Sequence, residues 1–331
     1  QWRAPFLDLE RVEVVRGPQS ILFGKNSVAG ALNITTAKPT DEFEASLMAS
    51  WEFEDNESII EGVVSGPISD RVRYRVAART RELNGHMWNA TTQEDEPLRE
   101  DTMVRGTLEF DVSDSLVATL KAEIGEFDVT GRHIEIVNEQ GSPAFGGATY
   151  AQILFGAFGA DSSVLNTVQD EVRSSNGDFS NNESENFVLT LDWALGANSL
   201  EAITAYSTFE YDEFCDCAFT GAGVFGAALQ EQYEQISQEF RLTSPLGGKF
   251  DYIAGLYYQT SDHDYADQII VPSDSILVPA INAQSPGAGF LVSDTQASRL
   301  ATVENDVISA FAQFNCCLLY TSDAADDSVY V

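Results

Sequence analysis

The chain has 331 residues and a mass of 36.1 kDa, with 52 acidic and 18 basic side chains and a formal net charge of −34. This charge repels phosphates and excludes nucleic acid as a partner. A hydrophobic content of 44% supports a sizeable core, and the lack of any apolar run of about 18 residues excludes a helical membrane protein.

The first 40 residues differ in pattern from the remainder of the chain. Residues 11–16 alternate charged and apolar side chains, which predicts a strand. Gly17 and Pro18 end this strand, and residues 30–36 form a second predicted strand. Pro39 closes the segment, so the pattern indicates a small unit ahead of the main fold.

From Glu42 onward the sequence has a period of two residues. Residues 43–53 place apolar side chains at odd positions and mostly polar ones at even positions. The same alternation recurs in residues 104–112, 116–124, 187–193, 236–243 and 250–259. Such a pattern is typical of long antiparallel strands with one apolar face, and it predicts about ten of them.

The connections between these strands sort by length. Short turns are expected at residues 67–70, 113–114, 196–198 and 245–248, after a brief first loop at 55–57. Longer links are expected at residues 84–101, 129–183, 212–232 and 263–301. Strict alternation of short and long connections favours an outer-membrane β-barrel over a soluble β-sandwich or a propeller. Aromatic residues near strand ends fit interfacial girdles: Trp51, Phe53, Tyr206, Tyr211, Phe250, Tyr252, Tyr257 and Tyr258.

One segment carries a specific resemblance. Residues 9–39 read LERVEVVRGPQSILFGKNSVAGALNITTAKP. This segment resembles the C-terminal part of the plug domain of TonB-dependent outer-membrane receptors. Residues 237–242, SQEFRL, also look like a barrel strand of that family.

The resemblance implies an all-β fold: a transmembrane antiparallel β-barrel with the end of an N-terminal plug domain. Residues 1–40 would be the C-terminal part of the plug, and residues 41–315 the N-terminal half of a barrel of about 22 strands. In the family, a signal peptide, a TonB box and most of the plug precede this motif, and about twelve more strands come after it. We therefore expect the chain to be truncated at both ends.

The last residues do not read like the rest. Residues 317–327, CLLYTSDAADD, match the translation of a transposase-type sequencing adapter, so residues 316–331 are predicted to be a non-native tail. Removing the three aspartates of this tail changes the net charge from −34 to −31. Cys215 and Cys217 then remain as the only native cysteines, too few for a disulfide framework.

Charged residues supply the first candidate contacts. Arg11, Glu13 and Arg16 lie on the polar side of the first strand and, by the plug resemblance, are expected to contact barrel carboxylates such as Glu44, Glu52 or Glu109. Five arginines of one parity form a basic ladder that must face the lumen, since each would cost about 2–4 kcal/mol in lipid: Arg71, Arg73, Arg75, Arg79 and Arg81. The ladder suits an anionic ligand, but pairing with plug and barrel carboxylates is the favoured interpretation.

Histidines and cysteines supply a second set of candidate contact residues. His86, His133 and His263 each fall in or beside a different expected external loop and could contact a ligand there. Cys215 and Cys217 lie at the base of another loop, where a local disulfide is favoured over a metal site, because structural zinc sites use four ligands. No cofactor, metal site or catalytic residue is predicted; a Gly-x-Ser-x-Gly hydrolase motif is absent.

The family resemblance implies binding and transport without turnover. The expected function is TonB-dependent active uptake of a scarce nutrient complex, foremost a ferric siderophore, across the outer membrane of a Gram-negative bacterium. The expected partners are TonB, the nutrient complex, and outer-membrane lipid and lipopolysaccharide. Alternatives are uptake of a saccharide or a cobalamin-type compound, a passive porin-like barrel, and an outer-membrane enzyme; the plug motif argues against the porin, and the lack of a nucleophile–base set argues against the enzyme.

Overall fold

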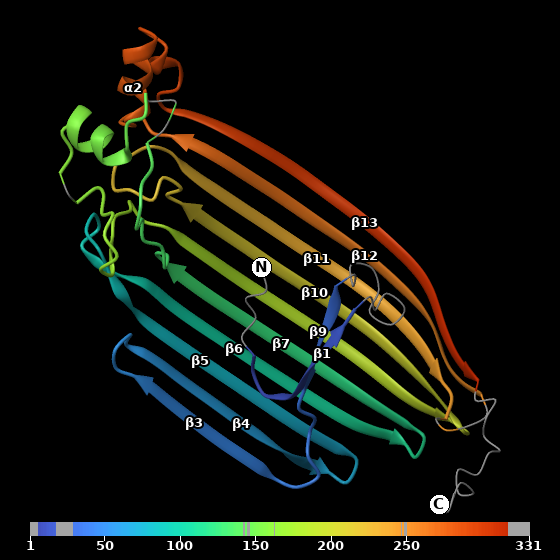
Figure 1. The fold of residues 1–331 in the computed structure, drawn as a ribbon. Helices are drawn as coiled ribbons and strands as arrows, with labels where there is room; N and C mark the ends of the chain where they lie inside the picture. Colours follow the sequence, from blue (N-terminus) through green and yellow to red (C-terminus); the bar gives the residue numbers. More distant parts are fainter. Residues whose placement is uncertain are drawn as a thin grey trace, which may run out of the picture.

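The computed structural model describes residues 6–17, 29–141, 143, 146–161, 163–245, 247 and 250–316. Its main feature is one large, curved antiparallel sheet (Figure 1). Ten strands lie in chain order across it, apart from a short strand, β8 (Val172–Arg173), which pairs with β5. The ten are β3 (Glu44–Glu52), β4 (Glu57–Ser69), β5 (Val72–Asn89), β6 (Glu94–Ser113), β7 (Leu116–Thr130), β9 (Phe179–Leu195), β10 (Asn198–Cys215), β11 (Gly226–Thr243), β12 (Phe250–Val271) and β13 (Thr295–Cys316).

The prediction of an all-β fold with about ten long antiparallel strands is confirmed. The adapter-like residues 317–331 and residues 18–28 of the plug-like motif lie outside the described residues. β3 and β13 form the two edges of the described sheet, and neither has a further partner there.

Connections at the two ends of the sheet differ in length. One end carries the turns at 70–71, 114–115, 196–197 and 244–249. The other end carries the loops at 131–178, 216–225 and 272–294, which gather above the sheet in Figure 1. The expected long link at 84–101 is wrong, because β5 and β6 extend through it and meet at residues 90–93. Polar side chains on both strand faces there hide the period of two.

The strand extension also corrects the histidine predictions. His86 lies within β5 and His263 within β12, so neither is a loop residue, whereas His133 lies in the loop at 131–178. Arg71 occupies the turn before β5. The hydrogen-bonded strands β5 and β12 thus extend beyond the segments in which apolar and polar residues alternate.

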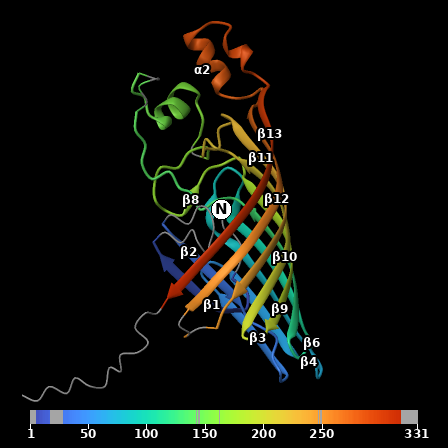
Figure 2. The same ribbon diagram turned by 90° about the vertical axis from the view of Figure 1, so that its right-hand side faces the viewer.

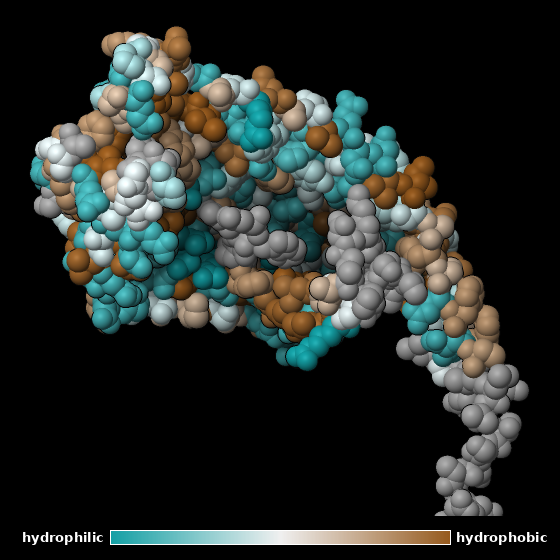
Figure 3. All heavy atoms as spheres, turned by 45° about the horizontal axis from the view of Figure 1, so that its top comes forward, coloured by the Kyte–Doolittle hydropathy of each residue, from teal (hydrophilic) through white to brown (hydrophobic). Residues whose placement is uncertain are grey.

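The two faces of the sheet have different chemistry. Leu108, Leu120 and Leu189 occupy directly paired positions on β6, β7 and β9 and point to the convex side. Their neighbours one residue along point to the concave side, since side chains alternate across a strand. Hydrophilic side chains line the hollow of the molecule in Figure 3. This arrangement matches a barrel wall with an apolar exterior and a polar interior.

A separate strand pair lies on the concave side. β1 (Leu9–Arg16) and β2 (Gly30–Thr36) form a two-stranded antiparallel sheet with Val12 opposite Ile34. Figure 2 shows this pair standing away from the edge-on wall of the large sheet, on its hollow side. The segment just before β1 connects it to that wall.

The loops form a cap of their own. The loop at 131–178 contains a six-residue π-helix, Gln152–Ala157, and the loop at 272–294 contains α2 (Leu277–Gln284). Leu154, Leu165 and Ala222 pack together in a small apolar cluster that joins the loops at 131–178 and 216–225. Among the described residues, no helix combines the length and apolar character needed to cross a bilayer.

Candidate functional site

The N-terminal unit meets the wall through one buried leucine. Leu7 is fully buried and packs against Val63, Ala77 and Met103 of β4, β5 and β6. Arg105 of β6 donates a hydrogen bond from Nη1 to the Leu7 carbonyl oxygen over 2.7 Å. A single apolar contact thus holds the segment, and polar contacts surround it.

Charged contacts from β5 complete this junction. Arg75 donates two hydrogen bonds to the Asp8 carboxylate, over 2.7 and 2.6 Å. Arg79 donates to the Phe6 carbonyl oxygen over 3.2 Å. The pairing of Arg75 with Asp8 is bidentate, the strongest geometry for a guanidinium and a carboxylate.

Arg73 and Arg81 of the predicted ladder also have partners, whereas the Arg71 side chain has none among the residues that the structure describes. Arg73 lies 2.8 Å from both Glu109 and Asp111. Arg81 pairs with Glu57 and lies 3.7 Å from Asp101. The ladder therefore faces mainly carboxylates and one carbonyl oxygen in the described chain, which leaves little positive charge for an anionic ligand.

The expected barrel contacts of β1 do not form in the described chain. Arg11 pairs with Glu10 over 2.8 Å and lies 3.3 Å from Glu13, which also accepts a hydrogen bond from Asn33. Within the described ranges, no contact to the wall involves Arg16. Of the expected partners, Glu44 and Glu109 lie near Arg75 and Arg73, and Glu52 accepts N–H groups of its own turn. Leu7 and Asp8, which the motif did not single out, make these contacts.

Beside this junction the concave face holds a cavity of about 660 Å³. Gly125 and Ser184 pair directly between Met103 on one side and Phe209 on the other. Their small side chains leave room that larger neighbours on the same face would fill. The residues around the cavity are Met103, Glu123, Gly125, Glu126, Phe127, Asn182, Ser184, Asn186, Ser207, Thr208, Phe209, Tyr211, Glu213, Leu229, Glu231 and Tyr233.

An aromatic row extends this cavity toward β12. Phe209 stacks on its cross-strand partner Tyr233, with ring centroids 5.2 Å apart. Tyr233 meets the ring of His263 edge-on at 5.8 Å, and His263 Nε2 lies 3.5 Å from Glu231. Tyr211, expected in an interfacial girdle, lines the cavity and donates to Glu213. His263 therefore lies in the wall of the lumen.

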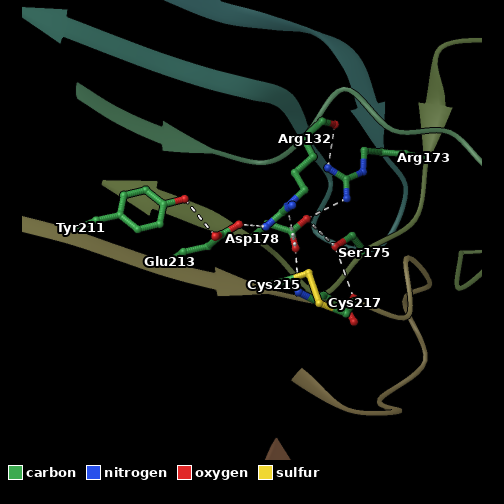
Figure 4. The surroundings of a disulfide bond; sticks show 9 residues. Arg132, Arg173, Ser175, Asp178, Tyr211, Glu213, Cys215 and Cys217 are labelled. Atoms are coloured by element: carbon green, nitrogen blue, oxygen red, sulfur yellow. Dashed lines mark hydrogen bonds and ion pairs between the residues drawn. A yellow bond between two sulfur atoms is a disulfide. The ribbon is translucent and has the colours of Figure 1, made fainter. Parts of the chain in front are cut away.

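A buried ion network anchors the long loop above the cavity (Figure 4). Arg173 is 2% exposed and lies 2.9 Å from both Glu96 and Asp178, which are equally buried. Arg132 bridges from the loop to Glu213 at the rim of the cavity. The start of the loop is thereby tied to β10 and its returning part to β6.

A disulfide lies at the centre of this network. Cys215 and Cys217 are bonded, as the sequence favoured for this spacing, with Cα atoms 5.1 Å apart. Asp216 between them accepts the Asn176 N–H over 2.8 Å and donates its own N–H to Asp178 over 2.6 Å. Burial raises the pKa of the Asp216 carboxyl above its ordinary value, and the charge of Asp178 adds to the shift.

His86 and His133 form a pair beside this network. Their rings stack with centroids 4.9 Å apart, and His133 Nδ1 lies 3.4 Å from His86 Nε2. Burial, and then the charges of His86, Arg99 and Arg81, lower the pKa of His133. No group of three or more metal-ligating side chains occurs in the part of the chain that the structure describes.

Sequence comparison finds similarity to bacterial receptors and outer-membrane proteins. No protein-family model matches the chain. It is 31% identical over 86 residues to the iron-regulated outer membrane virulence protein of Vibrio cholerae, covering 24% of this chain and 13% of that protein. It is 27% identical over 182 residues to the pesticin receptor of Yersinia pestis, covering 49% of this chain and 26% of that receptor.

Structural comparison extends the likeness to nearly the whole fold. The siderophore receptor PiuA from Acinetobacter baumannii superposes with a TM-score of 0.61 at 16% sequence identity, over 93% of this chain and 45% of that receptor. The chain thus spans less than half the length of that receptor, and its matched segments cover about a quarter or less of the curated relatives above. In sequence and in fold, the chain is similar to part of the TonB-dependent outer-membrane receptors that its residues 9–39 resemble.

Proposed function

We propose that this chain belongs to a receptor that takes up a ferric siderophore across the outer membrane of a Gram-negative bacterium, driven by TonB. Relatives in sequence are an iron-regulated outer membrane protein and receptors for pesticin and ferric pyoverdine. Residues 1–40 would be the end of the plug, residues 41–315 one side of the barrel wall, and residues 316–331 a non-native tail. The convex face would meet membrane lipid, and the loop end lipopolysaccharide.

The observation that carries the proposal is the contact between the N-terminal unit and the wall. One buried leucine, the Arg75–Asp8 ion pair and two hydrogen bonds to carbonyl oxygens hold the segment. Polar contacts of this kind exchange readily with water, so a pulling partner can displace the unit from the lumen. A passive porin has no need of such a unit, and the relatives are receptors, so we propose binding and transport without catalysis.

Growth under iron limitation tests the proposal. The gene, expressed from start to stop codon in a Gram-negative host that makes no siderophore, should restore growth on at least one ferric siderophore of a chemically diverse panel. Growth should be lost in an otherwise identical host that lacks TonB. Uptake that persists without TonB would favour a passive barrel, and growth on a saccharide or a cobalamin-type compound alone would favour those alternatives.

Asp8→Ala gives an internal check on the plug contact. Removing the carboxylate leaves Glu44, at 3.8 Å, as the remaining acidic partner of Arg75 among the described residues. We expect faster proteolysis of the N-terminal unit, because its ion pair with the wall is gone, and an unchanged amount of receptor in the membrane. Glu10→Ala is the matched control, since the described part of the chain pairs Glu10 only with Arg11 of its own strand.

A further inference from the structure

We infer that the cavity between β6 and β11 binds a cationic group of the transported complex, so that the receptor prefers ferric complexes with a free ammonium group over anionic ones. This inference rests on the proposed function and specifies the class of its substrate. The cavity opens on the concave face beside the junction with the N-terminal unit.

All the charged side chains that line the cavity are acidic. Three carboxylates on inward-facing positions line it, and no lysine or arginine does. Glu123 pairs with Arg105, and Glu213 pairs with Arg132. Glu231 lies between Tyr211 and Tyr265 of the neighbouring strands, and its only basic neighbour in the described chain is His263. His263 Nε2 lies 3.5 Å from the Glu231 carboxylate and makes no hydrogen bond there. One carboxylate therefore faces the cavity without a permanently charged partner.

The hydrogen bonds around the cavity also favour a cationic ligand. Ser184 donates its hydroxyl to the Gly125 carbonyl oxygen over 3.3 Å, and Tyr233 donates to Gln235 over 2.6 Å. Asn182 donates its amide to the Glu210 carbonyl oxygen over 3.0 Å. The hydroxyl groups of Ser184 and Tyr233 direct their donors into the wall, and Asn182 directs one of its two amide N–H groups there, so these groups offer a ligand mainly oxygen acceptors. An ammonium group, which has three donors and no acceptor, fits such a surface.

Aromatic faces add a third contribution. The rings of Phe209 and Tyr233 stack beside Glu231, and aromatic faces carry the negative end of the ring quadrupole. A cation over such a face is attracted to it. A protein cation already uses one ring of this wall, because the Arg99 guanidinium lies 6.0 Å from the centroid of Phe127.

The basic residues of the same face, Lys121 included, do not line the cavity. Arg73, Arg75 and Arg81 are paired with carboxylates. Arg79 lacks a carboxylate partner in the described chain, but it does not line the cavity and is turned to the Phe6 carbonyl oxygen. An anionic complex in the cavity would meet carboxylates and find no free guanidinium.

Three ferric complexes with one chelating core give a direct test. Ferrioxamine B carries a free ammonium group, its N-acetyl derivative is neutral, and its N-succinyl derivative carries a carboxylate. Binding of each, labelled with radioactive iron, is measured on outer membranes that contain the receptor as its gene encodes it. We expect the ammonium complex to bind about tenfold more tightly than the neutral one, and the succinyl complex to bind most weakly.

Glu231→Gln tests the residue. It keeps the size of the side chain and removes its charge, so the advantage of the ammonium complex over the neutral one should shrink by about tenfold. Affinity for the neutral complex should stay within about twofold. Glu234→Gln is the matched control: Glu234 lies three residues along β11, on the opposite face, and should leave all three affinities unchanged.

The outcomes separate the two proposals. Equal or tighter binding of the succinyl complex, or an ammonium preference that survives Glu231→Gln, overturns the inference while uptake of ferric complexes stands. Binding of none of the three, with growth on another ferric siderophore, also overturns it. Failure of every ferric complex in the growth panel overturns the proposed function itself.

Discussion

The two faces of the same strands differ in whether their charged side chains have partners of opposite charge. On the concave face, arginines of β5 and β6 lie against carboxylates, as Arg73 does against Glu109. On the convex face an apolar band gives way toward the loop end to carboxylates that have no basic partner in the described residues. These are Glu82, Glu100, Glu126, Asp128, Glu183, Glu185, Glu210, Asp212, Glu234, Asp262, Asp264, Glu304 and Asp306.

The surrounding medium explains the difference. A charge next to lipid is costly, so the band is apolar, whereas a charge in water needs no partner. A charge buried in protein needs a partner, because desolvation is costly when the charge stands alone. The level at which convex carboxylates begin therefore indicates where the strands leave the membrane.

The largest expected effect is at the most buried ion pair. Arg173→Ala leaves the buried Glu96 without a basic partner in the described residues and leaves Asp178 with Arg132 alone, at 3.7 Å. Breaking a buried ion pair costs about 3–5 kcal/mol. We expect the loop at 131–178 to detach and to be cleaved rapidly by added protease. Peptide mapping of the cleaved receptor in outer membranes would locate the cut.

Arg299→Ala is the control for this variant. Arg299 also pairs with an aspartate, Asp267, over 2.7 Å, but its side chain is 79% exposed. Because water screens this pair, its removal should leave the cleavage pattern unchanged. Equal damage from the two variants would contradict the claim that burial decides what an ion pair contributes.

The next largest effect is expected for an arginine placed on one face of β9 or, one residue along, on the other. Leu189→Arg places a guanidinium on the convex side of β9, where we expect a loss of about 2–4 kcal/mol in the free energy of unfolding. Thr190→Arg places the same group on the concave side, in the row that contains Glu109 and Glu239. Urea titration in lipid vesicles should show a much smaller loss for Thr190→Arg. Similar losses would mean that the convex side does not face lipid.

This one-residue contrast also shows how far the sequence predicts the fold. Strand alternation is local, so the polar and apolar faces, the ten strands and the paired ladder of Arg73 to Arg81 can be deduced from residue parity. The plug-like segment can be deduced from a dense motif. Strand ends were missed at residues 84–101, because polar side chains on both faces leave no period of two.

The candidate site depends on strand register and on loop contacts, and residue alternation along a strand reveals neither. Phe209, Tyr233 and His263 form a row only because β10, β11 and β12 pair in one particular register. Arg173 and Glu96 are 77 residues apart in the chain and meet through a loop. Parity could have placed Phe209, Tyr211 and Glu213 on one face, but only the register shows what lies beside them.

A smaller effect is expected at the disulfide. Cys215→Ser with Cys217→Ser frees Asp216 to move away from Asn176 and Asp178, and so loosens the loops at 131–178 and 216–225. The effect should be smaller than that of Arg173→Ala, since the ion pairs of Arg173 remain. Protease cleavage should rise severalfold in the double variant, and treatment of the parent receptor with a thiol reductant should reproduce the rise. An unchanged cleavage rate would show that the disulfide does not hold the loops.

The histidine pair predicts a dependence on pH. His133 has a lowered pKa in the fold, so the neutral ring is the stable form. Its contribution is complete above the ordinary value of 6.5 and is lost as the pH falls through the lowered pKa. Cleavage of the loop at 131–178 should therefore speed up as the pH falls below 6.5, and His133→Asn should remove this increase. Asp216, whose pKa is raised, contributes in the opposite direction, so a cleavage rate that falls in the parent on acidification would point to Asp216.

The smallest effect is expected among the unpaired convex carboxylates. Glu210 lies directly opposite Glu183 on β9, and like charges in that position repel. Glu210→Gln should therefore raise the free energy of unfolding slightly, by about 0.2–1 kcal/mol at low salt, and the gain should vanish as salt screens the repulsion. Asn182→Ala on the opposite face of β9 should lower it instead, because the amide donates to the Glu210 carbonyl oxygen. If Glu210→Gln lowered the stability at every salt concentration, the convex carboxylates would have a partner, and water alone would not explain why this face tolerates them.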